Sequence, residues 1–370
     1  MKILIIADPI DEQYAGVYYY TRNLIENLLK IDKENEYVFL HLKKNSFFKD
    51  KKEYIVPGTR KFPGCMIIRK LLFIPFAIRK IKPDIVFEPA HIGPFSFFYK
   101  CKKIVVIHDL TPILFSHYHV AFSGLIHKIF LPLIIRNVDG IVVPSQSTKA
   151  DLIKLFNVSK PVSVTDEAAA ENFYPKSANE IKQVREKFEI EKDYIIAVGT
   201  LEPRKNLKIV LEVFSKIKTE FQDIQFVIVG KKGWKINQFL KEIKKIENDI
   251  IVTGYVDDGD LPRLYSGASV MIFPSIYEGF GLPPLEAMQC GCPVVCSNTS
   301  SLPEVCGEAA ILFDPENPEE LEDAMKIVLS DKDIRKKMKK KGLEQSSKFS
   351  WQKCAEETIN FFQQINNNEA

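Results

Sequence analysis

Short apolar runs alternate with helical patterns along nearly the whole chain, and this alternation constrains the fold more than any other feature. Runs dense in Ile and Val are typical of strands that are buried on both faces, and the helical patterns between them fit parallel crossovers. The expected strands of the first series are 2–7, 37–42, 84–88, 103–108 and 140–144; those of the second are 194–199, 225–230, 250–254, 269–274, 293–297 and 310–314. Two such series predict an α/β protein with two parallel sheets.

The chain has 370 residues, which is too long for one ordinary hydrophobic core and predicts two domains. A polar segment at 166–179 is the natural linker between them. We therefore expect an N-terminal domain at 1–172 and a C-terminal domain at 173–349. The last segment, 350–370, carries Trp and Phe at helical spacing, so it predicts a terminal helix that docks on a domain surface.

Composition excludes several classes of protein. The net charge is only +3 and no recognised nucleic-acid module is evident, so nucleic-acid binding is not expected. The apolar run in the first residues, MKILIIADP, is too short for that of a signal peptide. No apolar run is long enough to span a bilayer. Seven cysteines, an odd number, fit a reduced compartment, and Cys290, Cys292 and Cys296 lack the spacing of a zinc site. We expect a cytoplasmic protein without a bound metal.

One segment, 60–82, is strongly basic. It contains seven Lys and Arg residues, no acid, and many apolar residues between the bases. This pattern is typical of a peripheral patch that binds anionic lipid at the inner face of a membrane. It fits equally well a core helix with a solvated basic edge, and the sequence does not choose between the two.

The stretch 273–304 has the features of a helix start built around a ligand. Glu278 is followed by a Gly-Phe-Gly turn and by Pro283-Pro284, which suit the first turn of a helix. Backbone N–H groups at such a helix start can bind an anion. Glu286 follows in the same helix, eight positions after Glu278, so two carboxylates are expected near one site.

A second candidate anion site lies in 197–214. A buried strand ends at Gly199-Thr200, and Arg204 and Lys205 stand at the expected start of the next helix, with Asn206 near its cap. Two cations at a helix start oppose the helix dipole, which indicates that an anion binds there.

These two segments resemble glycosyltransferase family 4, whose signature is Glu, seven residues and Glu in a loop like SIYEGFGLPPLEAMQCGCPVV. The resemblance implies a GT-B fold, with two Rossmann-like doubly wound domains whose parallel sheets face a central cleft, and a C-terminal helix that docks back on the N-terminal domain. It also implies retained anomeric configuration. Glu278 would hold hydroxyls of the donor sugar and Glu286 the ribose hydroxyls. The backbone around the turn would face the sugar and the diphosphate, through Gly279, Phe280, Gly281 and Leu282.

The resemblance assigns further donor contacts. Lys205 would clamp the diphosphate with help from Arg204. Thr200 stands where many members have an arginine. Tyr255, in a Gly-Tyr-Val turn, would line the nucleobase pocket largely through its backbone.

Two residues of the N-terminal half extend the resemblance. His108 ends a strand in VVIHDLTP and matches the family's active-site histidine, beside the transferred sugar. Gly16 matches one of two glycines that approach the diphosphate in the family, and Ala15 stands at the other. The acids Asp257, Asp258 and Asp260 are interpreted as a polar turn that caps the next helix and not as a metal site.

The resemblance predicts a retaining hexosyltransferase that needs no metal or other cofactor. The donor would be a nucleoside-diphosphate sugar, GDP-mannose first and a UDP-sugar second. The acceptor would be a glycan or a lipid-linked glycan of envelope polysaccharide or lipopolysaccharide synthesis. A nucleotide-sugar epimerase and a catalytically silent, membrane-associated binding subunit are the alternatives; a dinucleotide oxidoreductase is disfavoured because the first strand is not followed by Gly-x-Gly-x-x-Gly.

Overall fold

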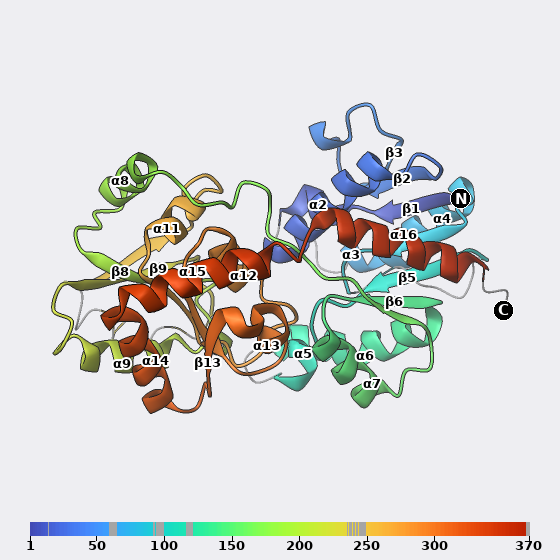
Figure 1. The fold of residues 1–370 in the computed structure, drawn as a ribbon. Coiled ribbons are helices and arrows are strands. Elements are labelled where there is room, and N and C mark those ends of the chain that lie inside the picture. The colour runs from blue at the N-terminus through green and yellow to red at the C-terminus, as the bar shows by residue number, and fades with distance from the viewer. Residues whose placement is uncertain are drawn as a thin grey trace. The chain divides into compact units, whose positions relative to one another are not determined.

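The computed structural model describes residues 1–13, 15–58, 65–91, 93, 100–115, 121–234, 236, 239, 241, 243 and 249–367. The chain forms two compact units (Figure 1). Unit 1 comprises Met1–Glu167 and Trp351–Ala370, and unit 2 comprises Ala168–Ser350. The first division falls a few residues before the boundary expected at 172.

Unit 1 is built on a seven-stranded parallel sheet of order β3-β2-β1-β4-β5-β6-β7. Its strands are β1 (Lys2–Ile6), β2 (Glu36–His41), β3 (Glu53–Ile55), β4 (Ile85–Glu88), β5 (Lys102–Val106), β6 (Gly140–Val143) and β7 (Val162–Val164). The strand order reverses beside β1, which makes the sheet doubly wound. The side chains of the central strands are almost fully buried, as their Ile and Val content predicts.

The described helices of unit 1 are α1 (Asp8–Glu12), α2 (Ala15–Ile31), η1 (Ser46–Phe48), α3 (Cys65–Ile68), the π-helical turn η2 (Arg69–Phe73), α4 (Ile74–Ile81), α5 (Thr111–Leu114), α6 (Ala121–Asn137), α7 (Gln146–Phe156) and α16 (Trp351–Asn367). Helix α16 lies beside α2 (Figure 1), so the end of the chain returns to the N-terminal domain. The expected docking of the C-terminal helix is confirmed.

Unit 2 has a six-stranded parallel sheet of order β10-β9-β8-β11-β12-β13. Its strands are β8 (Asp193–Val198), β9 (Ile224–Val229), β10 (Ile250–Gly254), β11 (Val270–Phe273), β12 (Val294–Ser297) and β13 (Ala310–Phe313). Its described helices include α8 (Ala178–Lys187), η3 (Pro203–Lys205), α9 (Leu207–Ile217), α11 (Leu261–Gly267), α12 (Leu282–Gln289), α13 (Leu302–Cys306), η5 (Gly307–Ala309), α14 (Pro318–Ser330) and α15 (Lys332–Ser346).

The predicted α/β class with two doubly wound, Rossmann-like domains is confirmed. Every strand expected from the sequence is present, with ends that differ by a residue or two. The strands β3 and β7 were not predicted. Among the residues that the structure describes, none of the helices combines the length and apolar content that a bilayer-crossing helix needs.

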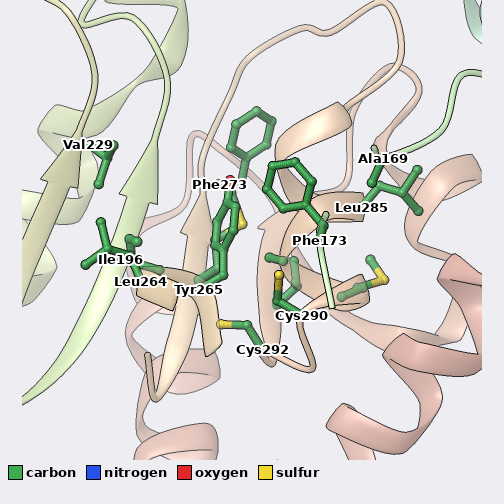
Figure 2. Close-up of a cluster of buried hydrophobic side chains, with 14 of the residues drawn as sticks. Ala169, Phe173, Ile196, Val229, Leu264, Tyr265, Phe273, Leu285, Cys290 and Cys292 are labelled. Atoms are coloured by element: carbon green, nitrogen blue, oxygen red, sulfur yellow. The ribbon is translucent and has the colours of Figure 1, made fainter. Parts of the chain in front are cut away.

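One face of the sheet in unit 2 packs against α12 and fixes the start of that helix. Figure 2 shows this core, in which Tyr265 of α11, Phe273 of β11 and Leu285 of α12 lie among buried side chains. Cys290 and Cys292, just after α12, are buried in the same cluster. Because α12 is held by this apolar layer, the polar groups at its N-terminus have defined positions.

Candidate active site

The candidate site lies where the strand order of unit 2 reverses. Strands β8 and β11 are hydrogen-bonded neighbours, and the next strand along the chain after β8, β9, lies on the other side of β8. In open α/β sheets, ligands bind outside the carboxyl ends of the strands at such a point. Lys205 follows β8 and Glu278 follows β11, so the topology brings the two predicted segments together.

The turn after β8 positions Lys205. Gly199 has φ +147°, a conformation that favours glycine, and a Cβ there would lie 3.2 Å from Cε of Lys205. Arg204 and Lys205 lie in the short 3₁₀ turn η3, and α9 begins only at Leu207. The predicted helix start at these two cations is therefore wrong by a few residues. Asn206, in the left-handed region at φ 49°, makes no side-chain cap and instead donates to the carbonyl of Pro315.

Two cations converge on Glu278. Nζ of Lys205 lies 2.7 Å, and a terminal nitrogen of Arg204 2.9 Å, from Oε1 of Glu278. Arg204 also donates to Oε1 of Glu202 at 2.6 Å and to the carbonyl of Tyr277 at 2.5 Å. The four charged side chains are largely buried, with 5 to 13% of their surface exposed. The formal charges of this cluster, Glu202, Arg204, Lys205 and Glu278, cancel.

The cluster determines the charge state of its members. Burial alone would raise the pKa of Glu278, but Arg204 and Lys205 outweigh it and lower that pKa to about 2. Burial lowers the pKa of Lys205, and Glu278 opposes that change. At neutral pH Glu278 is therefore ionised and accepts hydrogen bonds only.

The loop after Glu278 is held by two serines. The backbone N–H of Glu278 donates to Oγ of Ser300 at 2.8 Å, and the hydroxyl of Ser301 donates to the carbonyl of Phe280 at 2.5 Å. Gly281, with φ +116°, precedes α12, so this turn needs a glycine. The predicted helix with proline in its first turn is present. Because Pro283 and Pro284 have no N–H, the backbone N–H groups at its start are those of Gly281 and Leu282, directly after Gly279 and Phe280.

Glu286 is the fifth residue of α12, just past the first turn in which it was expected. The hydroxyl of Tyr265 donates to its Oε2 at 3.2 Å. Burial raises the pKa of Glu286 to about 7, and the bond from Tyr265 only partly opposes this. Glu286 is therefore a carboxyl group that can gain or lose its proton near neutral pH.

The remaining donor candidates lie at strand ends of the same sheet. Thr200 directly follows Gly199 after β8. Tyr255 follows β10 and is 58% exposed, with Nζ of Lys231 4.5 Å from its ring centre.

The acidic turn before α11 does not cap it as predicted. Asp260 makes no side-chain cap, and its carboxylate accepts from Lys187 and Arg263. No group of three or more His, Cys, Asp or Glu side chains within the described ranges is arranged to hold a metal ion.

Two of the predicted site residues, His108 and Gly16, belong to unit 1. His108 follows β5; its Nδ1 lies 3.2 Å from Oε1 of Glu167 and its Nε2 2.8 Å from the carbonyl oxygen of Pro89. Gly16 lies in the first turn of α2, and among the described residues outside its own stretch of helix no atom lies within 4 Å of a Cβ placed on it. There is thus open space in front of the backbone at Gly16.

Three side chains that complete these groups are not among the predicted site residues. Glu202 binds Arg204, Tyr265 binds Glu286 and Glu167 binds His108. Glu202 lies two residues before Arg204 and could have been noticed as an acid beside the two cations. Tyr265 and Glu167 lie far along the chain from their partners, and no local signal marks them.

Two family models match this chain. Residues 14–165 match the model described as Glycosyltransferase Family 4, and residues 179–345 match the model of group 1 glycosyl transferases. The chain belongs to the family 4, group 1 glycosyltransferases. The O-antigen chain mannosyltransferase B of Escherichia coli is 29% identical over 98% of this chain and 99% of its own length. This glycosyltransferase is therefore similar in sequence to a mannosyltransferase along its full length.

Solved structures of other proteins superpose closely on the fold of this chain. The sucrose-phosphate synthase of Thermosynechococcus elongatus superposes with a TM-score of 0.79 at 18% identity, covering 99% of each chain. Anabaena Alr3699/HepE, solved with UDP-glucose, superposes with a TM-score of 0.77 at 15% identity, covering 98% of this chain and 100% of its own. At these identities the similarity establishes the fold, and the fold is GT-B.

Proposed function

We propose that this glycosyltransferase moves a hexose, with retained anomeric configuration and without a metal ion, from a nucleoside-diphosphate sugar to a glycan or lipid-linked glycan. GDP-mannose is the first candidate donor and a UDP-sugar the second. The observation that carries the proposal is the buried cluster of Lys205, Arg204 and Glu278 at the switch point of unit 2. The family's mannosyltransferase relative supports mannose and a role in O-antigen synthesis. The UDP-glucose complex of HepE supports a nucleotide-sugar donor.

In this proposal the protein supplies fixed charge and positioning. Lys205, Arg204 and the backbone N–H groups of Gly281 and Leu282 at the start of α12 stabilise the departing diphosphate. The bond from the anomeric carbon to the phosphate oxygen breaks, and the acceptor oxygen bonds to the same face of that carbon. The proton of the acceptor hydroxyl passes to the leaving phosphate oxygen, so no side chain needs to act as general base. Because the acceptor oxygen attacks the anomeric carbon directly, no side chain needs to act as nucleophile.

The charge balance of the cluster couples recognition of the sugar to that of the diphosphate. Lys205 is bonded to Glu278, so a diphosphate gains its full attraction only when Glu278 has other partners. Hydroxyl groups of the donor sugar can donate to Glu278 and supply those partners. We therefore expect the intact nucleotide sugar to engage Lys205 more completely than a nucleoside diphosphate does.

Product analysis tests this mechanism. The chain is incubated with GDP-mannose, an envelope-type mannoside acceptor and excess EDTA, and the anomeric configuration of the product is read by NMR. We expect transfer at an unchanged rate in EDTA and an α-linked product from the α-linked donor. An inverted product, or loss of transfer in EDTA that added Mg²⁺ restores, would contradict the proposal.

Glu286 predicts a pH dependence of donor binding. If its carboxylate accepts from the ribose hydroxyls, the donor binds the ionised form, and the affinity rises as the pH passes through the pKa of about 7. The Kd for GDP-mannose should therefore fall about tenfold between pH 6 and pH 8, measured by titration calorimetry. The diphosphate of a nucleotide sugar does not titrate in this range.

The matched variant for that experiment is Glu286→Gln. It keeps the shape of the side chain and removes the titrating group, so its Kd should stay flat with pH. If the Kd of this variant changed with pH as much as that of the original protein, the pH dependence would come from another group.

We further propose that this enzyme binds anionic membranes through the helical segment Cys65–Ile81. Arg60 and Lys61 of the predicted basic segment lie outside the described residues. Arg69, expected to be part of the basic surface, is instead buried and forms an ion pair with Asp8. The apolar residues divide into two faces: Ile74, Ala77 and Ile78 are buried in unit 1, whereas Ile68, Leu71, Leu72, Phe73 and Phe76 are exposed. Phe76 is 70% and Leu72 64% exposed, and bases follow them at the end of α4. An exposed apolar face beside basic residues suits a surface of anionic lipid.

Vesicle sedimentation tests the membrane proposal. We expect stronger binding to vesicles with anionic lipid than to neutral ones. Since insertion of a Phe side chain stabilises by roughly 2 kcal/mol, Phe76→Ser should weaken binding more than tenfold. Ile327→Ser, at an apolar residue of α14 in unit 2 that is 45% exposed, is the control and should bind as the original protein does. Equal binding to both vesicle types, or by both variants, would contradict the proposal.

A further inference from the structure

The ring of His108 lies between two oxygen acceptors. Oε1 of Glu167 is 3.2 Å from Nδ1, and the carbonyl oxygen of Pro89 is 2.8 Å from Nε2. A carbonyl oxygen only accepts hydrogen bonds, so Nε2 carries a hydrogen. An ionised carboxylate also only accepts, so Nδ1 carries the second. The geometry therefore favours the imidazolium form over either neutral tautomer.

The surroundings hold this ring in one orientation. Tyr20 of α2 packs edge-on against it at 4.7 Å between ring centres, and Trp351 of α16 packs behind Tyr20 at 5.9 Å. The side chain of Glu167 is 7% and that of His108 12% exposed. Rotation of the imidazole would break two hydrogen bonds in a nearly closed space.

The charged and titratable neighbours mostly favour the same form. Asp109 adds a second negative charge and is itself bonded to the backbone N–H and the hydroxyl of Thr111. The ring of His91 lies 5.5 Å away, and burial lowers its pKa to about 3, so it is neutral. Burial opposes charge on His108, but Glu167 outweighs it and raises the pKa of His108 above its usual value.

We propose that Glu167 is a positioning residue of the glycosyltransferase, which holds His108 as an imidazolium whose two N–H groups are both engaged. This rests on the proposed function and on the family resemblance, which implies that His108 lies beside the transferred sugar. An imidazolium held in this way has no free lone pair, so His108 contributes positive charge beside an anionic donor and cannot act as a general base. Glu167 follows β7, so the last strand of the sheet serves to bring this carboxylate to the end of β5.

Glu167→Gln tests the pairing, because it keeps an acceptor oxygen in the same place and removes the charge. NMR titration of the His108 ring should show a pKa at least about one unit lower than in the original protein. The alkaline limb of the kcat profile should move to lower pH by the same amount. Glu167→Asp, which keeps the charge, should restore part of the shift, and Glu171→Gln, at an exposed residue of the same segment, should change neither readout.

A double-variant cycle separates a positioning role from a merely structural one. If Glu167 acts through His108, Glu167→Gln costs no further activity in a His108→Gln background. An unchanged His108 titration in Glu167→Gln, or additive losses in the double variant, would overturn the inference. The titration needs no sugar donor, so a chain that transferred no sugar would contradict the proposed function without contradicting the pairing.

Discussion

Replacing Lys205 by alanine is expected to lower kcat for sugar transfer about 100- to 1000-fold, the usual effect of removing one group that stabilises charge in a transition state. Nζ of Lys205 is held 2.7 Å from Glu278 in a largely buried cluster, where a charge acts with little screening. The loss should appear in kcat more than in KM, because the charge on the diphosphate grows as the bond to the sugar breaks.

Steady-state kinetics with GDP-mannose measure this effect. Lys208→Ala is the matched control, since Lys208 is an exposed lysine three residues further along, on α9. It should retain the original kcat. A Lys205→Ala enzyme that kept kcat within a few-fold of the original would show that the leaving diphosphate is stabilised elsewhere.

Replacing Glu278 by alanine is expected to abolish detectable transfer and to lower the free energy of unfolding by about 3 kcal/mol. Arg204 keeps Glu202 as a partner in this variant, but Lys205 loses its carboxylate in a site that is only 12% exposed. An uncompensated buried charge accounts for the loss of stability. The loss of transfer follows because the donor sugar loses its acceptor for hydroxyl groups.

Urea unfolding measures the change in the free energy of unfolding of Glu278→Ala. Glu344→Ala removes a carboxylate from an exposed ion pair with Lys340 on α15, and should cost less than about 1 kcal/mol. If Glu278→Ala were as stable as Glu344→Ala, the two cations would not depend on this carboxylate. Transfer at the original rate by Glu278→Ala would contradict its role in binding the sugar.

The fold could be predicted well because the central strands are buried on both faces. Their apolar runs, such as 194–199 and 269–274, alternate with helical patterns along the chain, which is typical of parallel strands covered by helices on both faces. The strands β3 and β7 escaped prediction for the opposite reason. Each has three residues, lies at the edge of the sheet and contains polar side chains, so neither has a continuous apolar run.

The site could be predicted only where its residues lie in local motifs. Lys205 and Glu278 each follow a strand with a recognisable turn, and the parallel topology brings them together. The partners Tyr265 and Glu167 lie 21 and 59 residues from Glu286 and His108. Such contacts depend on packing between distant elements, which single-sequence patterns do not encode. The prediction that the acidic turn at Asp260 caps α11 is wrong, because the carboxylate of Asp260 binds Lys187 of α8, which also lies far along the chain.

We propose above all that the cluster of Glu202, Arg204, Lys205 and Glu278 in unit 2 binds a nucleoside-diphosphate sugar without a metal ion. A thermal-shift series with UDP-, GDP-, ADP- and dTDP-sugars in excess EDTA tests it most directly, with the original chain and Lys205→Ala side by side. At a ligand concentration of about 100 Kd the correct donor stabilises the folded state by about 2.7 kcal/mol, so we predict a clear rise in Tm that Lys205→Ala largely loses. A series in which no nucleotide sugar raises Tm, or in which Lys205→Ala responds as fully as the original chain, would contradict the account.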